Sequence, residues 1–382
     1  MITDVQSLPP HPNLEQYRKQ AKDLLKAWKS RDVEAVERVR KFHPRKGEPS
    51  FGLAGAQLTV AREHGFESWP KFARHVESLA RAASPVSQFE QAADAIAEGD
   101  LAMLDRLLLE NPTLIRARST RAHRGTLLHY IGANGLEDYR QKTPPNAPDI
   151  LRLLLRSGAE VNAEAHMYRG DTALELVATS IHPLVAGVQQ EMLEILLAAG
   201  STVDSATVRA CVANGRGRAA EFLAARVDHL DLEAAAGVGR LEQVRAAIEA
   251  GASQDQIQSA LGWAAEYGRV AVLEFLLKRG AEPGSPAHGG QTALHWAAVG
   301  GQAEAARILI RHGAALEIKN VYGGTPLDQA VWSALHDSLG IDYMPVIEAL
   351  LAAGADPKAV VLPTGNARID DVLRRAISAT ES

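Results

Sequence analysis

Two short polar stretches hold the residue types that acid–base chemistry and anion binding use. The stretch EAHMYRGD brings Glu164, His166, Tyr168, Arg169 and Asp171 within eight positions. Carboxylate and imidazole groups exchange protons with substrates, and an arginine beside them binds negative charge. Such a set becomes a site only if the fold turns it toward a cleft. The alternative interpretation is that these polar side chains belong to a solvated loop.

A basic stretch comes before it. In RARSTRAHR, residues 116–124, Arg121 and His123 stand among three further arginines. This cluster could hold a phosphate or a carboxylate, although arginines on exposed turns are commonly just solvated. A third stretch, HDSLGIDY at residues 336–343, matches no metal-binding spacing. The HExxH, GxSxG and Walker motifs are absent. We therefore predict no catalytic residue, no metal site and no cofactor.

Aromatic side chains recur at one position of a repeating pattern. Tyr130 and Trp296 each directly follow a histidine, and Trp263 lies 33 residues before Trp296. Tyr267 lies about one helical turn after Trp263. A cluster of these rings on adjacent units would anchor a peptide or a flat ligand. The alternative interpretation of the tryptophans is packing between neighbouring units.

The amino-acid composition indicates that helices position these residues. Hydrophobic residues make up 46% of the 382-residue chain and aromatic residues only 5%, which favours small-residue helix packing over an aromatic-rich sheet. The single cysteine, Cys211, cannot form a disulfide within the chain, so we expect a reducing compartment. No signal-peptide pattern opens the sequence and no apolar run is long enough for a bilayer. We predict a cytoplasmic protein without membrane contact.

The net charge of −5 is unevenly distributed. Residues 1–83 hold 15 Lys and Arg against 10 Asp and Glu, and the rest of the chain holds 26 against 36. A basic front part raises the hypothesis of nucleic-acid binding. Opposite charges alternate along RDVEAVERVRK, however, as they do on a solvated helix face. Nucleic-acid binding is therefore the weakest of our hypotheses.

A period of 33 residues organises the second half of the chain. TALH at 292–295 returns as TPLD at 325–328, and Gly-Ala closes the units LLKRGAEP, LIRHGAAL and LLAAGADP. Paired alanines allow one helix to approach its neighbour closely, and Leu, Ile and Phe fill the following helix. Glycine at a helix end adopts the left-handed conformation without steric cost. The pattern predicts helix-turn-helix units that stack on their neighbours.

This pattern, T-x-L-H-x-A-A followed by L-L-x-x-G-A, resembles the ankyrin repeat. TLLH at 126–129, TALE at 172–175, TALH and TPLD carry the resemblance. It implies an all-α ankyrin-repeat solenoid of about eight helix-turn-helix units. It also implies that His129 and His295 link neighbouring loops by hydrogen bonds. The units start near residues 87, 124, 170, 206, 230, 257, 290 and 324.

A small helical domain precedes the repeats. Asn13 and Asp32 are suited to begin two helices, a third is expected near 53–64, and a fourth from Ser68 to about residue 81. The phrases LPPHPNLEQYRKQAKDLLKAW and AQLTVAREHGFESWPKFARHVE resemble a helical module found ahead of ankyrin repeats in bacterial proteins. We expect residues 1–83 to form this module, 84–366 the ankyrin-like repeat array, and 367–382 a C-terminal capping helix and tail.

Departures from a regular array suggest where binding occurs. Extra residues fall between the two helices of a unit at 136–148, 179–189 and 333–345. The projecting loops between units, here called fingers, are long at 118–126, 163–172, 285–292 and 319–325 and short near residues 201, 227 and 252. We expect a concave face with fingers at both ends and a cleft between them.

The resemblance implies a non-enzymatic recognition scaffold that binds a protein or peptide partner in this concave face. The alternative is a small-molecule-binding protein or an enzyme, with its site in the concave groove of the middle repeats. Arrays of this kind mostly bind, so the order of the two hypotheses depends partly on resemblance. The predicted groove residues are Tyr130, Trp263, Tyr267, Trp296, Glu164, His166, Tyr168, Arg169, Arg121 and His123.

Overall fold

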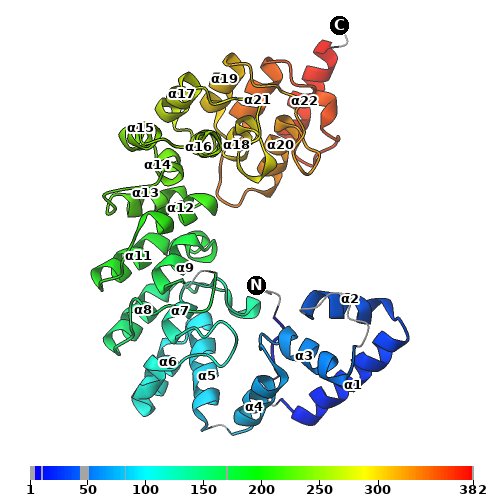
Figure 1. The fold of residues 1–382 in the computed structure, drawn as a ribbon, viewed down its shortest axis with the longest axis vertical. Coiled ribbons are helices and arrows are strands. Elements are labelled where there is room, and N and C mark those ends of the chain that lie inside the picture. The colour runs from blue at the N-terminus through cyan, green and yellow to red at the C-terminus, as the bar shows by residue number, and fades with distance from the viewer. Residues whose placement is uncertain (1–4, 10–11, 44–50, 82, 169–170, 381–382) are drawn as a thin grey trace. The chain divides into compact units, whose positions relative to one another are not determined.

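The computed structural model describes residues 5–9, 12–43, 51–81, 83–168 and 171–380. Within these ranges it contains 22 α-helices and four short 3-10 helices, and no β-strand beyond an isolated bridge between Pro286 and Thr292 (Figure 1). The all-α class predicted from the sequence is therefore confirmed. The chain divides into two compact units, Met1–Thr202 and Val203–Ser382. Every helix of the described residues is too short or too polar to cross a bilayer.

Four helices at the front of unit 1 surround their own apolar core, in which Tyr17, Phe66 and Phe72 are buried. The first two begin where their capping residues predict. The Asn13 side chain accepts a hydrogen bond from the Glu15 amide, and Asp32 accepts one from the Ala35 amide. The helices are α1 (Leu14–Lys29), α2 (Val33–Phe42), α3 (Leu53–Glu63) and α4 (Trp69–Leu79).

The rest of unit 1 consists of helix pairs. The first helices α5, α7 and α9 contact one another in succession, and so do the second helices α6, α8 and α11. The extra residues at 136–148 form η2 and those at 179–189 form α10. The elements are α5 (Pro85–Glu98), α6 (Leu101–Glu110), η1 (Pro112–Arg116), α7 (Leu127–Tyr130), η2 (Asp138–Arg140), α8 (Ala147–Arg156), α9 (Ala173–Thr179), α10 (His182–Val185) and α11 (Gln189–Ala198).

Unit 2 continues with the same pairing. The first helices α12, α14, α16, α18 and α20 form one row, while α15, α17, α19 and α21 form a second row (Figure 1). The C-terminal helix α22 packs on η4 and α21. The elements are α12 (Ser205–Ala213), α13 (Gly217–Ala224), α14 (Leu232–Val238), α15 (Leu241–Glu249), α16 (Gln254–Glu266), α17 (Val270–Lys278), η3 (His288–Gly290), α18 (Ala293–Val299), α19 (Ala303–Arg311), α20 (Pro326–His336), α21 (Met344–Ala352), η4 (Pro357–Ala359) and α22 (Ala367–Thr380).

Small residues allow the first helices to lie close together. Ala264, Ala265, Ala297 and Ala298 are completely buried between α16, α18 and their neighbours. At Gly300 the approach is so close that a Cβ atom would clash with the carbonyl oxygen of the residue that ends α16. The close spacing between repeats thus requires the sequence pattern of paired alanines followed by glycine.

His295 links one unit to the next as predicted. Its Nδ1 accepts hydrogen bonds from the Thr292 amide at 3.3 Å and from the Thr292 hydroxyl at 2.8 Å, which caps α18. Because Nδ1 is an acceptor, Nε2 carries the proton and donates to the Gly324 carbonyl oxygen at 3.1 Å, in the following finger. His129 makes the same cap, accepting from the Thr126 amide at 3.1 Å.

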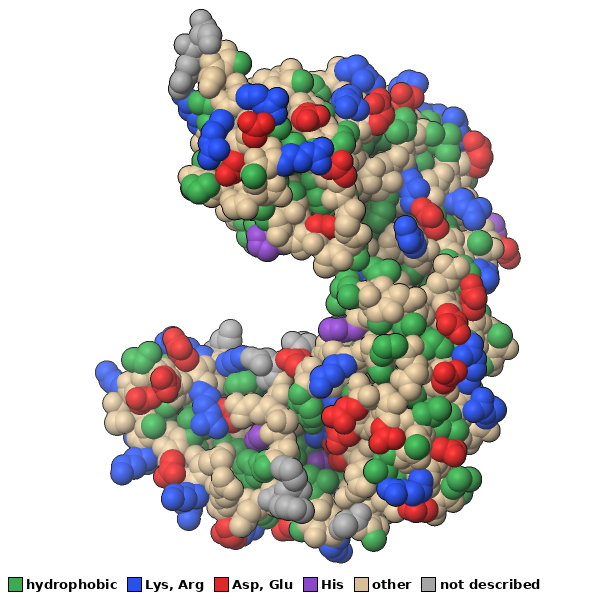
Figure 2. All heavy atoms as spheres, turned by 180° about the vertical axis from the view of Figure 1, so that it is seen from behind, with side chains coloured by type: hydrophobic (Ala, Val, Ile, Leu, Met, Phe, Trp, Pro, Cys, Tyr) green, Lys and Arg blue, Asp and Glu red, His purple; other side chains and the backbone are tan. Residues whose placement is uncertain are grey.

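Charged side chains of both signs are interspersed on the face of the molecule in Figure 2. They do not gather there into a field of one sign. Such a mixture is typical of a solvated protein surface.

Candidate functional site

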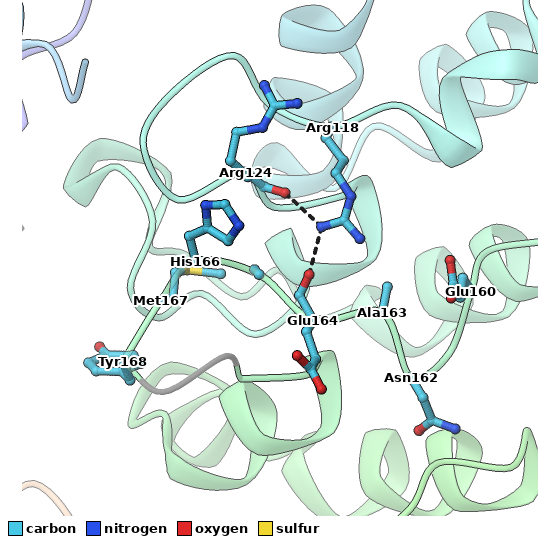
Figure 3. Close-up of a pocket in the computed structure, with 10 residues that line it drawn as sticks. Arg118, Arg124, Glu160, Asn162, Ala163, Glu164, His166, Met167 and Tyr168 are labelled. Atoms are coloured by element: carbon cyan, nitrogen blue, oxygen red, sulfur yellow. Dashed lines mark hydrogen bonds between the residues drawn. The ribbon is translucent and has the colours of Figure 1, made fainter. Parts of the chain in front are cut away.

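The two long fingers of unit 1 lie side by side and enclose a groove of about 880 Å³ (Figure 3). The His166 amide donates to the His123 carbonyl oxygen at 2.6 Å, which joins one finger to the other. The guanidinium of Arg118 adds a second link, since Nη1 donates to the carbonyl oxygens of Glu164 at 2.6 Å and Arg124 at 3.1 Å. These contacts hold the walls of the groove in place.

Three of the predicted site residues line this groove together. They are Glu164, His166 and Tyr168, and two arginines of the first finger lie with them. Figure 3 shows the Glu164 carboxylate turned away from Arg118, and Tyr168 apart from both. Arg169, which we predicted beside them, lies outside the described residues.

The groove is lined mainly by hydrogen-bonding groups. Among its described lining residues there is no serine, threonine or cysteine that His166 could activate. The Tyr168 hydroxyl is engaged, since it donates to Asn134 Oδ1 at 2.8 Å. In the described part of the chain, no three His, Cys, Asp or Glu side chains gather as a metal ion would require. The groove offers two guanidinium groups, two carboxylates, an imidazole and an amide to the polar groups of a bound chain.

Arg121 and His123, predicted for an open groove, turn into the interior of unit 1 instead. Arg121 is 3% exposed and His123 is 7% exposed. Arg121 Nη1 donates to Glu90 Oε1 at 2.5 Å, and its Nε lies 2.9 Å from Glu137 Oε1. Arg140 Nη1 donates to Glu90 Oε2 at 2.8 Å. We call Glu90, Arg121, Glu137 and Arg140 the buried ion network.

Mutual attraction keeps the buried ion network charged. Burial raises the pKa of Glu90, but Arg121 and Arg140 outweigh it and lower that pKa to about 2. Burial also raises the pKa of Glu137, yet the charge of Arg121, with His123 and Arg140, holds it well below its ordinary value. Two carboxylates meet two guanidinium groups here, so the network carries no net charge and each member compensates the burial of the others.

Sequence reasoning missed three members of the network. Glu137 and Arg140 lie in the extra residues at 136–148, which we interpreted only as a loop. Their spacing of three, which brings an acid and a base together on one helical turn, is the pattern that could have drawn attention to them. The contact with Glu90 could not be inferred in this way, because it lies 31 residues from Arg121.

Tyr130 packs beside the network and is 1% exposed. Its hydroxyl donates to Glu137 Oε1 at 3.4 Å. Its ring lies edge-on to Phe89 and His123, with 6.0 Å between ring centroids in each pair. The structure therefore places Tyr130 in the core of unit 1 and away from the predicted groove surface.

Unit 2 brings the two predicted tryptophans together. The ring centroids of Trp263 and Trp296 are 6.0 Å apart, with 32° between the ring planes. Trp263 is buried and Trp296 is half-buried. Tyr267, expected to be exposed, is half-buried because its hydroxyl donates to the Val212 carbonyl oxygen at 2.5 Å. Of this trio, Trp296 and Tyr267 keep part of their surface in solvent.

Exposed apolar side chains gather on another segment of unit 2. Of the 12 exposed large hydrophobic residues in the described chain, six lie between residues 321 and 341. Tyr322 is 86% exposed and Trp332 is 59% exposed. The Trp332 ring stacks on His336 with 4.3 Å between centroids. We call this set the 321–341 surface: Val321, Tyr322, Trp332, Leu335, Leu339 and Ile341.

A buried carboxylate lies at the end of α16. Glu266 is 9% exposed, and its Oε2 has no hydrogen-bond partner among the described residues. Burial raises the pKa of Glu266 to about 8. Because the neutral acid is the favoured form in this setting, the side chain keeps its proton at neutral pH.

Comparison with protein families identifies the repeats. The family model of ankyrin repeats (3 copies) matches residues 261–360, which begin within α16 and end just after η4. Comparison with curated proteins finds no significant match. The matched segment contains Trp263, Tyr267, Trp296 and the whole 321–341 surface. The total of eight units and the module at the front stay predictions.

Proposed function

We propose, from the premise that residues 261–360 are ankyrin repeats, that the chain is a non-enzymatic scaffold that recognises a protein or peptide partner. Ankyrin repeats are generally protein-interaction modules. The observation that carries the proposal is the 321–341 surface, which lies inside the matched segment and holds half of the exposed large apolar side chains of the described residues.

The chemistry of this surface fits protein recognition. Single exposed hydrophobic residues are ordinary, but a contiguous apolar patch marks an interaction surface, and we propose that these six side chains form one. Tyr322 and Trp332 are residue types that dominate binding energy in protein interfaces. Burying a ring such as Trp332 removes about 150–250 Å² of surface from water, which is worth several kcal/mol. We infer that the partner offers apolar side chains to these two rings.

Two further features support the same function. The half-buried Trp296 and Tyr267 lie on the row of first helices, the concave side of an ankyrin repeat, and extend the available aromatic surface. The finger groove of unit 1, with Glu164 and His166, offers hydrogen-bonding groups to an extended chain. We propose that the partner contacts the first helices and the fingers of unit 2, with Tyr322 and Trp332 as its anchors.

Site-specific photo-crosslinking tests the proposal. A photoreactive amino acid replaces Leu335 in the full chain in the host cell, and a second version carries it at Val33, an exposed apolar position of α2. We expect a defined protein adduct only from position 335. The adduct should disappear when Trp332→Ser is added. Equal labelling from both positions, or an adduct that survives Trp332→Ser, would show that the 321–341 surface is not the recognition site.

A further inference from the structure

A cavity of about 290 Å³ lies in unit 1 where the helices at its front meet the first finger. Arg62 and Phe66 line it on the side of the front helices. Leu136 and Glu137 line it on the side of the repeats. None of its lining residues also lines the finger groove of Figure 3, so the two hollows are separate.

The walls of this cavity are fixed by the fold. The Ala122 amide donates to the Gly65 carbonyl oxygen at 3.0 Å, which joins the finger to the turn after α3. Gly65 has a φ of +79°, a backbone conformation that residues with a side chain rarely adopt, so the turn favours glycine. The Arg121 guanidinium lies 5.6 Å from the centroid of the Phe66 ring. Ligand pockets are commonly preformed in this way, at junctions between substructures.

One oxygen of Glu137 is satisfied and the other is not. Oε1 lies 2.9 Å from Arg121 Nε, 3.2 Å from His123 Nε2 and 3.4 Å from the Tyr130 hydroxyl. Oε2 has no hydrogen-bond partner among the described residues, and Arg140 Nη1 forms an ion pair with it at 3.8 Å. The side chain is 1% exposed. A buried acceptor of this kind calls for a partner, because leaving it unpaired is costly.

An unpaired donor lines the same cavity. The Nε of Arg62 is buried and has no hydrogen-bond partner in the described part of the chain. Phe66 and Leu136 add apolar wall to the same cavity. The lining also includes Glu67 and therefore carries carboxylates as well as guanidinium groups. A molecule with one positive and one negative group fits this lining better than a dianion such as phosphate.

We propose that this cavity binds a zwitterionic α-amino acid with an apolar side chain. The carboxylate accepts from Arg62 Nε, the ammonium group donates to Glu137 Oε2, and the side chain packs on Phe66 and Leu136. Each group of the ligand then meets a group that the cavity leaves without a partner. The site lies in unit 1 and does not involve the 321–341 surface, so it goes beyond the scaffold function.

Calorimetric titration of the full chain at pH 7 tests the ligand class. The probes are valine, leucine, isoleucine, methionine and phenylalanine, each titrated separately. Two further probes, 4-methylpentanoate and isoamylamine, keep the side chain of leucine and carry only one of its two charged groups. We expect at least one amino acid to bind with a Kd below about 1 mM, and each single-charge probe to bind at least about tenfold more weakly than leucine. Failure of all five amino acids, or isoamylamine binding as tightly as leucine, overturns the proposal.

Two variants test the location. Arg62→Met removes the unpaired donor, and Ala122→Leu fills part of the cavity while keeping its charges. We expect each to weaken amino-acid binding at least about tenfold. Arg74→Met is the matched control, because Arg74 is an exposed arginine of α4 outside the cavity lining, and it should bind as the unaltered chain does. Unchanged affinity in a folded Arg62→Met variant overturns the proposal even if Ala122→Leu does not fold.

Discussion

One oxygen of the buried Glu137 carboxylate accepts from His123 Nε2 and the Tyr130 hydroxyl and forms an ion pair with Arg121. We expect Glu137→Gln to lower the free energy of unfolding of unit 1 by about 3–5 kcal/mol, because it leaves a buried guanidinium without its full counter-charge. Hydrogen exchange of the amides in residues 85–140 measures the effect. Arg152→Ala is the control, since it removes an exposed ion pair with Glu191 and should leave exchange unchanged. Similar exchange in the two variants would contradict the role we assign to the network.

Glu266, unlike Glu137, is a buried acid without a charged partner for its Oε2 among the described residues. Burial raises the pKa of Glu266 to about 8. Between pH 4.5 and pH 8 the unfolded chain releases this proton while the folded chain keeps it, so stability falls as pH rises. Glu266→Gln removes the titration. We expect the free energy of unfolding of the Glu266→Gln variant, relative to that of the unaltered chain, to increase from pH 5 to pH 8. The increase should be at most about 1.4 kcal/mol per pH unit.

Urea unfolding of unit 2 at several pH values, followed by tryptophan fluorescence, checks this second prediction. Glu249→Gln is the control, since Glu249 is an exposed carboxyl at the end of α15. Its stability should follow the unaltered chain at every pH. A Glu266→Gln advantage that stays constant with pH would mean that Glu266 is ionised in the folded chain.

At the scale of elements, His295 connects the cap of α18 to the finger before α20. His295→Ala removes both the Thr292 cap and the bond to the Gly324 carbonyl oxygen. We expect a loss of about 1–3 kcal/mol in local stability, because buried groups on both sides lose their partner. Faster amide exchange should appear in residues 293–299 and 321–325. His312 is an exposed histidine after α19, and the control variant His312→Ala should show the amide exchange of the unaltered chain. Equally faster exchange in this control would mean that the effect is not specific to the His295 link.

Helix starts were predictable because capping chemistry is local. Asn13 and Asp32 begin α1 and α2 by bonds to amides two and three residues ahead, which a short sequence window contains. The path of extra residues was not predictable in the same way. α20 runs on to His336 and carries Trp332 on its exposed side before the loop begins. Whether added residues lengthen a helix or form a loop depends on what they pack against, which spacing does not reveal.

The candidate site shows the same limit. The pairing of Trp263 with Trp296 follows from the period of 33 residues, since equivalent positions of stacked units are neighbours. The inward turn of Tyr267 cannot be inferred from this period. It depends on Gly217, where a Cβ atom would lie 2.8 Å from the tyrosine ring. Arg121 likewise turns inward toward a carboxylate 31 residues away. Local spacing places residues on an element, and distant partners decide which of them face solvent.

At the scale of the whole molecule, the division at residue 202 predicts independent folding. We expect residues 1–202, expressed alone, to keep their helical content and to unfold cooperatively, because the module core and the buried ion network lie entirely within them. A fragment that stops at residue 130 is the control, since it lacks Glu137 and Arg140. Circular dichroism during heating compares the two. A non-cooperative 1–202 fragment, or equal stability of both fragments, would contradict the prediction.

Within each unit, the stacking of helix pairs has a consequence for biosynthesis. The Ala122 amide reaches back 57 residues to Gly65, and the Tyr267 hydroxyl reaches 55 residues to Val212. Partners at such separations are already outside the ribosomal exit tunnel when the later residue emerges. Each new helix pair can therefore pack on a pair that has already emerged. Translation at about 5–20 residues per second then produces the repeats in the order in which they pack.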